Sequence, residues 1–137
     1  MMRCRFQLLS IMTEPANRHA LLLFAHGSSD PSWAEPFIKL QSVIRERDRE
    51  QIVELAFLER INPSFEEAVT ALHARGIRQI TVAPLFLALG GHMRKDLPKL
   101  VGDARERTGI AFRVLPALGE VDTLIAAIAD WVAASAG

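Results

Sequence analysis

Three residues whose side chains can bind a divalent metal or transfer a proton each follow a short apolar segment of the sequence. They are His26, Glu59 and His92. Imidazole changes its protonation state between about pH 5 and 8 and is the commonest protein ligand of metals. Two imidazoles and a carboxylate at one place would suit a divalent first-row metal, or proton transfer near neutral pH. Because the three residues lie far apart in the sequence, this chemistry depends on a fold that brings them together.

Each of these residues also has a simpler structural explanation. His26 could bond backbone groups of the turn that it begins, and Glu59 could form a solvated ion pair with Arg60. His92 could be one of the first residues of a helix. The two kinds of explanation stay open until the elements that carry the residues are placed.

Four apolar runs, each closed by turn residues, alternate with segments in which apolar residues recur at helical spacing. Such a short run is typical of a strand buried on both faces of a sheet. We predict strands near residues 20–25, 52–58, 78–83 and 110–115. Strands that alternate with helices through short connections indicate a parallel sheet with helices on both faces. The predicted fold class is therefore α/β, a three-layer unit with a four-stranded parallel sheet.

The predicted helices have recognisable ends and faces. The second one begins with a capping box formed by Ser64 and Glu67. Gly109 is placed to end the helix that starts near His92. The last helix carries apolar residues between 121 and 132 that form a broader stripe than one buried face needs. This breadth makes the last helix a candidate for contact with a second copy of the chain.

In a parallel sheet the carboxyl ends of all strands lie at one edge, and α/β proteins bind ligands there. His26, Glu59 and His92 each follow the carboxyl end of a predicted strand. We therefore predict that the two histidines face one cleft, close enough to share a metal directly or through water. The other two histidines of the predicted domain, His19 and His73, are expected at the surface.

Length and composition exclude several classes of protein. The 137 residues suit one domain, and we expect a flexible N-terminal extension (1–18) before a single domain (19–137). Sixteen basic residues balance sixteen acidic ones, which argues against a nucleic-acid or membrane-surface partner. The single cysteine, Cys4, excludes an internal disulfide and a multi-thiolate zinc site. No segment is apolar for long enough to span a bilayer, and we expect a cytoplasmic protein.

Common nucleotide and hydrolase motifs are absent from the sequence. There is no G-x-x-x-x-G-K-[ST] loop, and no G-x-G-x-x-G follows the first predicted strand. No G-x-S-x-G elbow supports a serine hydrolase. The expected chemistry therefore uses no nucleotide.

Three stretches of the sequence resemble the sirohydrochlorin chelatases, and the short, CbiX-type cobaltochelatases most closely. They are the strand and His-Gly-Ser turn at 21–28, the Ala-Phe-Leu-Glu and Asn-Pro-Ser stretch at 56–64, and the block at 82–98. The block contains the pattern Pro-Leu-Phe-Leu…Gly-x-His…Asp-x-Pro, which is the most specific of the three, whereas His-Gly-Ser alone would be weak. The resemblance covers about residues 20–118.

This resemblance implies a flavodoxin-like, chelatase-like fold and insertion of a divalent metal into sirohydrochlorin without ATP, as in cobalamin or siroheme biosynthesis. The metal expected first is Co²⁺, with Fe²⁺ and Ni²⁺ as alternatives. The two active-site histidines of the family fall on His26 and His92, and Glu59 occupies a position where many members have an acidic residue. Longer members hold two such units in one chain, so the resemblance implies a homodimer here.

The expected substrate contacts lie in the same loops. Sirohydrochlorin carries carboxylate side chains, for which cationic groups, hydroxyl groups and helix N-terminal N–H groups are suitable partners. The expected residues are Ser28, Ser29, Leu85, Gly91, Arg94 and Lys95. Two other functions stay open: a carrier that binds metal or tetrapyrrole without turnover, and an unrelated flavodoxin-like protein whose histidines are structural.

Overall fold

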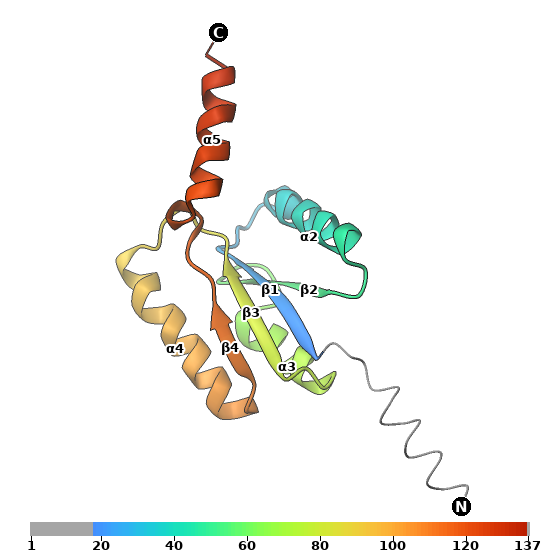
Figure 1. The fold of residues 1–137 in the computed structure, drawn as a ribbon. Coiled ribbons are helices and arrows are strands. Elements are labelled where there is room, and N and C mark those ends of the chain that lie inside the picture. Colours follow the sequence, from blue (N-terminus) through green and yellow to red (C-terminus); the bar gives the residue numbers. More distant parts are fainter. Residues whose placement is uncertain (1–17, 137) are drawn as a thin grey trace, which may run out of the picture.

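A four-stranded parallel sheet lies at the centre of the computed structural model, which describes residues 18–136 (Figure 1). The strands have the order β2-β1-β3-β4, and every neighbouring pair is parallel. Their bounds are β1 (His19–Ala25), β2 (Ile52–Phe57), β3 (Gln79–Pro84) and β4 (Ala111–Val114). The predicted fold class is confirmed, and the predicted strands differ from the observed ones by one residue at most at either end.

Helices cover the sheet from two sides (Figure 1). On one side, α2 (Glu35–Arg47) packs against β2 and β1, after the short 3₁₀ helix η1 (Pro31–Ala34). On the other side, α3 (Phe65–Ala74) and α4 (Gly91–Thr108) pack against each other and against the sheet. The three-layer arrangement agrees with the prediction.

The main hydrophobic core lies between the sheet and the pair α3 and α4. Alternate residues of β1 point into it, and Ala20, Leu22 and Phe24 are fully buried there. Four residues of α3, among them Val69 and Leu72, belong to the same cluster. A second and smaller cluster lies under η1 and α2, where Trp33 packs with its ring 4.6 Å from that of Phe37. The core therefore holds the carboxyl ends of the strands in fixed positions.

Two predicted helix ends, the start at Ser64 and the end at Gly109, are confirmed. The hydroxyl of Ser64 accepts a hydrogen bond from the N–H of Glu67 (3.1 Å), and the Glu67 carboxylate accepts one from the N–H of Ser64 (3.2 Å). These two bonds satisfy N–H groups that a helix start leaves without a partner. At the end of α4, Gly109 adopts the left-handed conformation with φ of 74°.

The last helix, α5 (Asp122–Ala134), forms where the sequence predicts it, but none of its residues is buried. It follows the 3₁₀ helix η2 (Leu118–Glu120) and points away from the sheet beyond the carboxyl ends of the strands (Figure 1). The helix α5 therefore lies outside the three-layer unit that α2, α3 and α4 form with the sheet.

The amino-terminal side of the fold begins at Arg18. The predicted extension, residues 1–18, lies outside the described residues except for Arg18, whose carbonyl oxygen accepts hydrogen bonds from the N–H groups of Arg78 and Gln79. His19 is half-buried in β1 rather than at the surface, and its Nε2 atom lies 2.7 Å from the hydroxyl of Thr81. Within residues 18–136, no helix has the length and apolar character needed to cross a bilayer.

Candidate active site

His26 and Glu59 meet at the carboxyl edge of the sheet because β1 and β2 are neighbours. The pairing of the two strands continues past their last residues: the N–H of Leu58 donates to the carbonyl of Ala25 (2.9 Å), and the N–H of Glu59 donates to the carbonyl of His26 (3.1 Å). These backbone bonds place the imidazole and the carboxylate side by side.

The side chains of the two residues are in direct contact. Nε2 of His26 lies 3.1 Å from Oε1 of Glu59, and the side chains are 54% and 50% exposed. The distance fits a hydrogen bond when one of the groups carries a proton. It also fits two ligands of one metal, because ligand atoms that are each about 2.1 Å from the same ion lie about 3 Å apart. The pair can therefore hold either a proton or a metal ion while both side chains remain open to water.

Gly27 determines how closely the two loops approach. Its φ of 100° lies in the left-handed region, and a Cβ atom at this position would overlap the backbone carbonyl oxygen of Glu59. Only glycine adopts this conformation easily and leaves room for the carbonyl. The glycine of the His-Gly-Ser motif thus has a physical role in bringing Glu59 to His26.

Arg60 is a second neighbour of the Glu59 carboxylate. Its Nε atom lies 3.8 Å from the same carboxylate oxygen that contacts His26. The residue has a φ of 68°, which is unusual for a side chain other than glycine, asparagine or aspartate. The sequence left open whether Glu59 pairs with Arg60 or joins His26, and the structure contains both contacts.

Phe86 is a site residue that the sequence analysis included in the block at 82–98 without giving it a role of its own. Its ring packs edge-on against the imidazole of His26, with centroids 6.3 Å apart and an interplanar angle of 88°. Phe86 also contacts the buried Phe24, at 6.0 Å. It therefore links the position of the imidazole to the core. Its place in the Pro-Leu-Phe-Leu pattern, in an apolar loop directly after a strand, was the available signal.

His92 is the second residue of α4 and is exposed. Among residues 18–136, no three or more His, Cys, Asp or Glu side chains are arranged as a metal site. In the single chain, His26 and Glu59 are therefore in contact. His92 does not join them in a group of three possible metal ligands. The sharing of a metal by His26 and His92 stays a prediction.

The loop after His26 is ordered by its own side chains. The Ser28 hydroxyl accepts a hydrogen bond from the N–H of Asp30 (3.1 Å), while Ser29 is exposed. The carboxylate of Asp30 caps η1 by accepting bonds from the hydroxyl of Ser32 (2.8 Å) and from its N–H (3.0 Å). The hydroxyl bond, followed by the backbone bond, lowers the pKa of Asp30 below its usual value. Ser28 is therefore engaged within the loop, and Ser29 is open to a ligand.

The other predicted substrate contacts surround the start of α4. Arg94 is exposed, and its Nε atom donates to the carbonyl of Leu89 (3.3 Å). Gly91 and Lys95 are exposed, and Leu85 is half-buried with its N–H bonded to the carbonyl of Phe24 (2.8 Å). Arg94 and Lys95 thus place two exposed cations beside the start of α4, which suits an anionic ligand.

An apolar cavity of about 370 Å³ adjoins this region, between α4 and β4. It is lined by Leu89, Met93, Arg94, Leu97, Pro98, Val101, Arg105 and Val114. Arg94 belongs both to the wall of this cavity and to the start of α4. The apolar surface of the loop that follows β3 therefore continues into this cavity.

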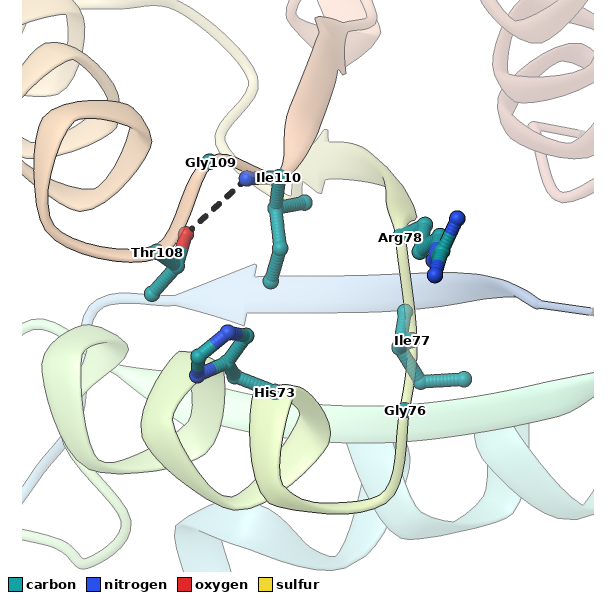
Figure 2. Close-up of a pocket in the computed structure, with 7 residues that line it drawn as sticks. All are labelled: His73, Gly76, Ile77, Arg78, Thr108, Gly109 and Ile110. Carbon is teal, nitrogen blue, oxygen red and sulfur yellow. Dashed lines mark hydrogen bonds between the residues drawn. The ribbon is translucent and has the colours of Figure 1, made fainter.

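A cavity of about 430 Å³ lies at the other end of the sheet, where β3 and β4 begin (Figure 2). Figure 2 shows it between the ends of α3 and α4, with the N–H of Ile110 bonded to the hydroxyl of Thr108 at 3.2 Å. Its lining residues are His73, Gly76, Ile77, Arg78, Thr108, Gly109 and Ile110. His73 is exposed, as expected, and is the only side chain in this lining of a type that commonly binds metal. The cavity is thus separate from the edge that carries His26 and Glu59.

Comparison with known proteins finds relatives over most of the chain. The CbiX family model matches residues 20–135. Sirohydrochlorin cobaltochelatases from Methanocaldococcus jannaschii and Saccharolobus solfataricus are both 39% identical to this chain, over 83 and 82 residues. These segments are 61% and 60% of this chain and 58% and 62% of the two relatives. The match therefore spans about three fifths of the length of each curated relative.

Solved structures agree with this family. The crystal structure of a CbiX protein from Marinobacter aquaeolei is 36% identical, with a TM-score of 0.76, over 85% of this chain and 96% of that chain. The sirohydrochlorin chelatase SirB from Bacillus subtilis subspecies spizizenii, in complex with cobalt, has a TM-score of 0.62 over 72% of this chain and 43% of that chain. At 24% identity, SirB supports the fold alone. The match of the family model over nearly the whole described chain means that this protein belongs to the CbiX family.

Proposed function

We propose that this protein inserts a divalent metal, first of all Co²⁺, into sirohydrochlorin without ATP. The observation that carries the proposal is the contact of 3.1 Å between His26 and Glu59 at the carboxyl edge of the sheet. It is supported by the family and by the names of the two relatives at 39% identity. Fe²⁺ and Ni²⁺ suit an imidazole and carboxylate pair as well, so the order of metals is part of what the experiment measures.

Metal insertion needs two things from the protein. The ion must be presented to the macrocycle and released, and two pyrrole N–H protons must be accepted. A neutral imidazole does either task near pH 7. In our proposal Glu59 and His26 hold the ion or relay a proton, and His92 contributes the second imidazole. A site with so few protein ligands leaves coordination positions open, whereas a structural zinc site is closed by four ligands.

The substrate side of the proposal rests on the loops around the pair. Arg94 and Lys95 lie exposed at the start of α4, and Ser29 is exposed in the loop after β1. Charged and hydroxyl groups of this kind bind carboxylates. Leu85 and the open N-terminus of α4 at Gly91 complete the surface. We place the carboxylates of the tetrapyrrole on these groups and its ring beside Phe86.

The proposed functional unit is a homodimer in the cytoplasm. The family resemblance supports it, because longer relatives of this kind contain two such units. One edge of a four-stranded sheet also offers a small surface for a wide macrocycle. The proposal includes no nucleotide, no nucleic acid and no membrane, in keeping with the balance of sixteen basic and sixteen acidic residues.

The experiment is a spectroscopic assay with purified protein, sirohydrochlorin and one metal at a time. Co²⁺, Fe²⁺ and Ni²⁺ are tested with and without ATP, and the absorption change is compared with that of protein-free mixtures. We expect many turnovers per chain with Co²⁺ and no effect of ATP. A spectral change that stops at one equivalent would identify a carrier, and no change above the protein-free rate would refute both functions.

A further inference from the structure

The imidazole of His26 is half-exposed, so its contacts with other side chains decide which rotamer it adopts. One contact is with Glu59, whose Oε1 atom lies 3.1 Å from Nε2. The other is with the ring of Phe86, which meets the imidazole edge-on with centroids 6.3 Å apart. A pair of rings in such an arrangement is favoured by about 2- to 12-fold. Phe86 therefore biases the imidazole toward the orientation in which it contacts Glu59.

The ring of Phe86 rests in turn on the hydrophobic core. Phe24 is fully buried, and its ring lies 6.0 Å from that of Phe86 and 5.3 Å from that of the buried Phe65. The backbone is attached at the same place, because the N–H of Leu85 donates to the carbonyl of Phe24 (2.8 Å). Side chains in a close-packed core keep their rotamers. A continuous row of aromatic rings thus connects the core to His26.

The short helix η2 holds the backbone of the loop that carries Phe86. The N–H of Leu118 donates to the carbonyl of Phe86 (2.9 Å), and the N–H of Gly119 donates to the carbonyl of Leu87 (2.7 Å). The residue before η2, Ala117, is 1% exposed, so the helix is anchored next to these two bonds. The loop is therefore held on one side by β1 and on the other by η2.

Gly119 makes the approach of η2 possible. A Cβ atom at this position would overlap the carbonyl oxygen of Leu87. Among the glycines that the structure describes, only Gly119 and Gly27 leave no room for a Cβ, and in both the atom in the way is a backbone oxygen. Gly27 brings the loop after β2 close to His26, and Gly119 brings η2 close to the loop after β3. Both close approaches thus hold loops that surround the imidazole.

The loop that η2 holds also leads to His92. It runs from the end of β3 at Pro84 to the start of α4 at Gly91, and His92 is the next residue. The Nε atom of Arg94 donates to the carbonyl of Leu89 (3.3 Å), which joins the first turn of α4 to the loop. The contact with η2 therefore affects the position of both histidines.

We infer that Phe86 is a positioning residue for His26, and that Gly119 keeps Phe86 in place by admitting η2 against its loop. Neither side chain offers a metal ligand or accepts a proton. Phe86 keeps the imidazole beside Glu59, where the two donor atoms are 3.1 Å apart and suit one metal ion. The inference rests on the proposed function in taking Co²⁺ as that ion, but it concerns binding of the ion before any tetrapyrrole is present.

The first experiment records the NMR signals of the His26 imidazole without metal or tetrapyrrole. Phe86→Leu and Gly119→Ala should each shift these signals, because the neighbouring aromatic ring is removed in one variant and displaced in the other. Phe86→Tyr keeps the ring and should keep the signals of the wild type. The signals of His73, which lies at the far end of the sheet, should stay unchanged in all three variants and thereby show that the fold is kept.

The second experiment measures Co²⁺ affinity by calorimetry, again without tetrapyrrole. Phe86→Leu and Gly119→Ala should weaken binding about tenfold, as expected when a residue that orients a metal-ligating histidine is lost. Phe86→Tyr should bind Co²⁺ as the wild type does. Two matched controls should also keep the affinity: Phe112→Leu, which removes another half-buried ring that packs on the same core, and Gly102→Ala, where no atom lies within 4 Å of the added carbon.

Unshifted His26 signals in Phe86→Leu or in Gly119→Ala would overturn the inference, and so would a wild-type Co²⁺ affinity in either variant. An equal loss of affinity in the two controls would also overturn it, because the effect would then come from a general loosening of the fold. Failure of the proposed function is a separate result. A wild type that binds Co²⁺ without inserting it would refute the proposed reaction, while the affinities of the variants still decide the inference. A wild type that binds no Co²⁺ would overturn both.

Discussion

The backbone of Gly27 lies so close to the carbonyl oxygen of Glu59 that no Cβ atom fits between the two residues. This approach, between the loops that follow β1 and β2, keeps the carboxylate within reach of His26. The glycine therefore supports the geometry of the site without touching a ligand.

Substitution of this glycine should affect both stability and activity. Gly27→Ala adds a Cβ at a positive φ, which costs about 1–2 kcal/mol, and it also forces the Glu59 carbonyl to move. Gly76→Ala is the matched control, because its φ is 83° and no atom lies within 4 Å of the added carbon. Urea denaturation should show a larger loss for Gly27→Ala, which should also insert metal at least tenfold more slowly. Equal losses of stability would show that the contact with Glu59 is unimportant.

The two histidines should be required for metal insertion and dispensable for folding. His26→Ala and His92→Ala should each slow the reaction about 100-fold or more, as expected when a proton acceptor or metal ligand is lost. Both residues are exposed, so the urea midpoint should change little. The control is His73→Ala, since His73 lies at the far end of the sheet (Figure 2). Wild-type rates in both variants would disprove the assigned chemistry.

Part of this geometry could be predicted from the sequence because it follows from the parallel direction of the strands, whereas the order of the strands was not predicted. Two apolar runs closed by His26 and Glu59 became neighbouring parallel strands, and the carboxyl ends of such strands meet at one edge. The capping box of Ser64 and Glu67 was predictable for a similar reason, since it depends on a spacing of three residues within one turn. Local sequence patterns and the direction of the strands are therefore sufficient to predict these features.

Other features depend on contacts that no local pattern encodes. The left-handed conformation of Arg60 and the packing of Phe86 on His26 result from the way three loops fit together. The apolar stripe of α5 was visible in the sequence, but a stripe shows only that a helix has a face to cover. It does not identify the surface that covers it. For the same reason the half-buried position of His19 beside Thr81 was missed.

The negative charge of Glu59 should contribute to the rate of metal insertion. Glu59→Gln keeps the size of the side chain and its ability to bond His26, but it removes the negative charge that attracts a metal ion or a proton. We expect insertion to slow by about 10- to 100-fold, the usual effect of losing a carboxylate that supports a ligating histidine. Glu66→Gln, at an exposed position of α3 whose ion pair with Arg107 is 3.9 Å long, should act at the wild-type rate. An unchanged rate of metal insertion in Glu59→Gln would contradict this prediction and would mean that the carboxylate has only a structural role.

The capping box of α3 should contribute to stability alone. Ser64→Ala removes the acceptor for the Glu67 N–H and should lower the free energy of unfolding by about 1 kcal/mol. Ser42→Ala, at an exposed position within α2, should be neutral or slightly stabilising because alanine favours helices. Urea denaturation measures both changes, and metal insertion should continue at the wild-type rate in each variant. A Ser64→Ala chain as stable as Ser42→Ala would contradict the assigned cap.

The half-exposed contact between His26 and Glu59 has a consequence for how this fold can evolve. Both side chains extend from residues just beyond the ends of their strands and bury little surface. A substitution there changes the set of donor atoms offered to a metal while the core under the sheet keeps its packing. Under the proposed function, histidine or aspartate at position 59 would alter metal preference at a small cost in folding. If this pair holds the metal as proposed, metal preference and foldability reside in different residues, and the first can change without loss of the second.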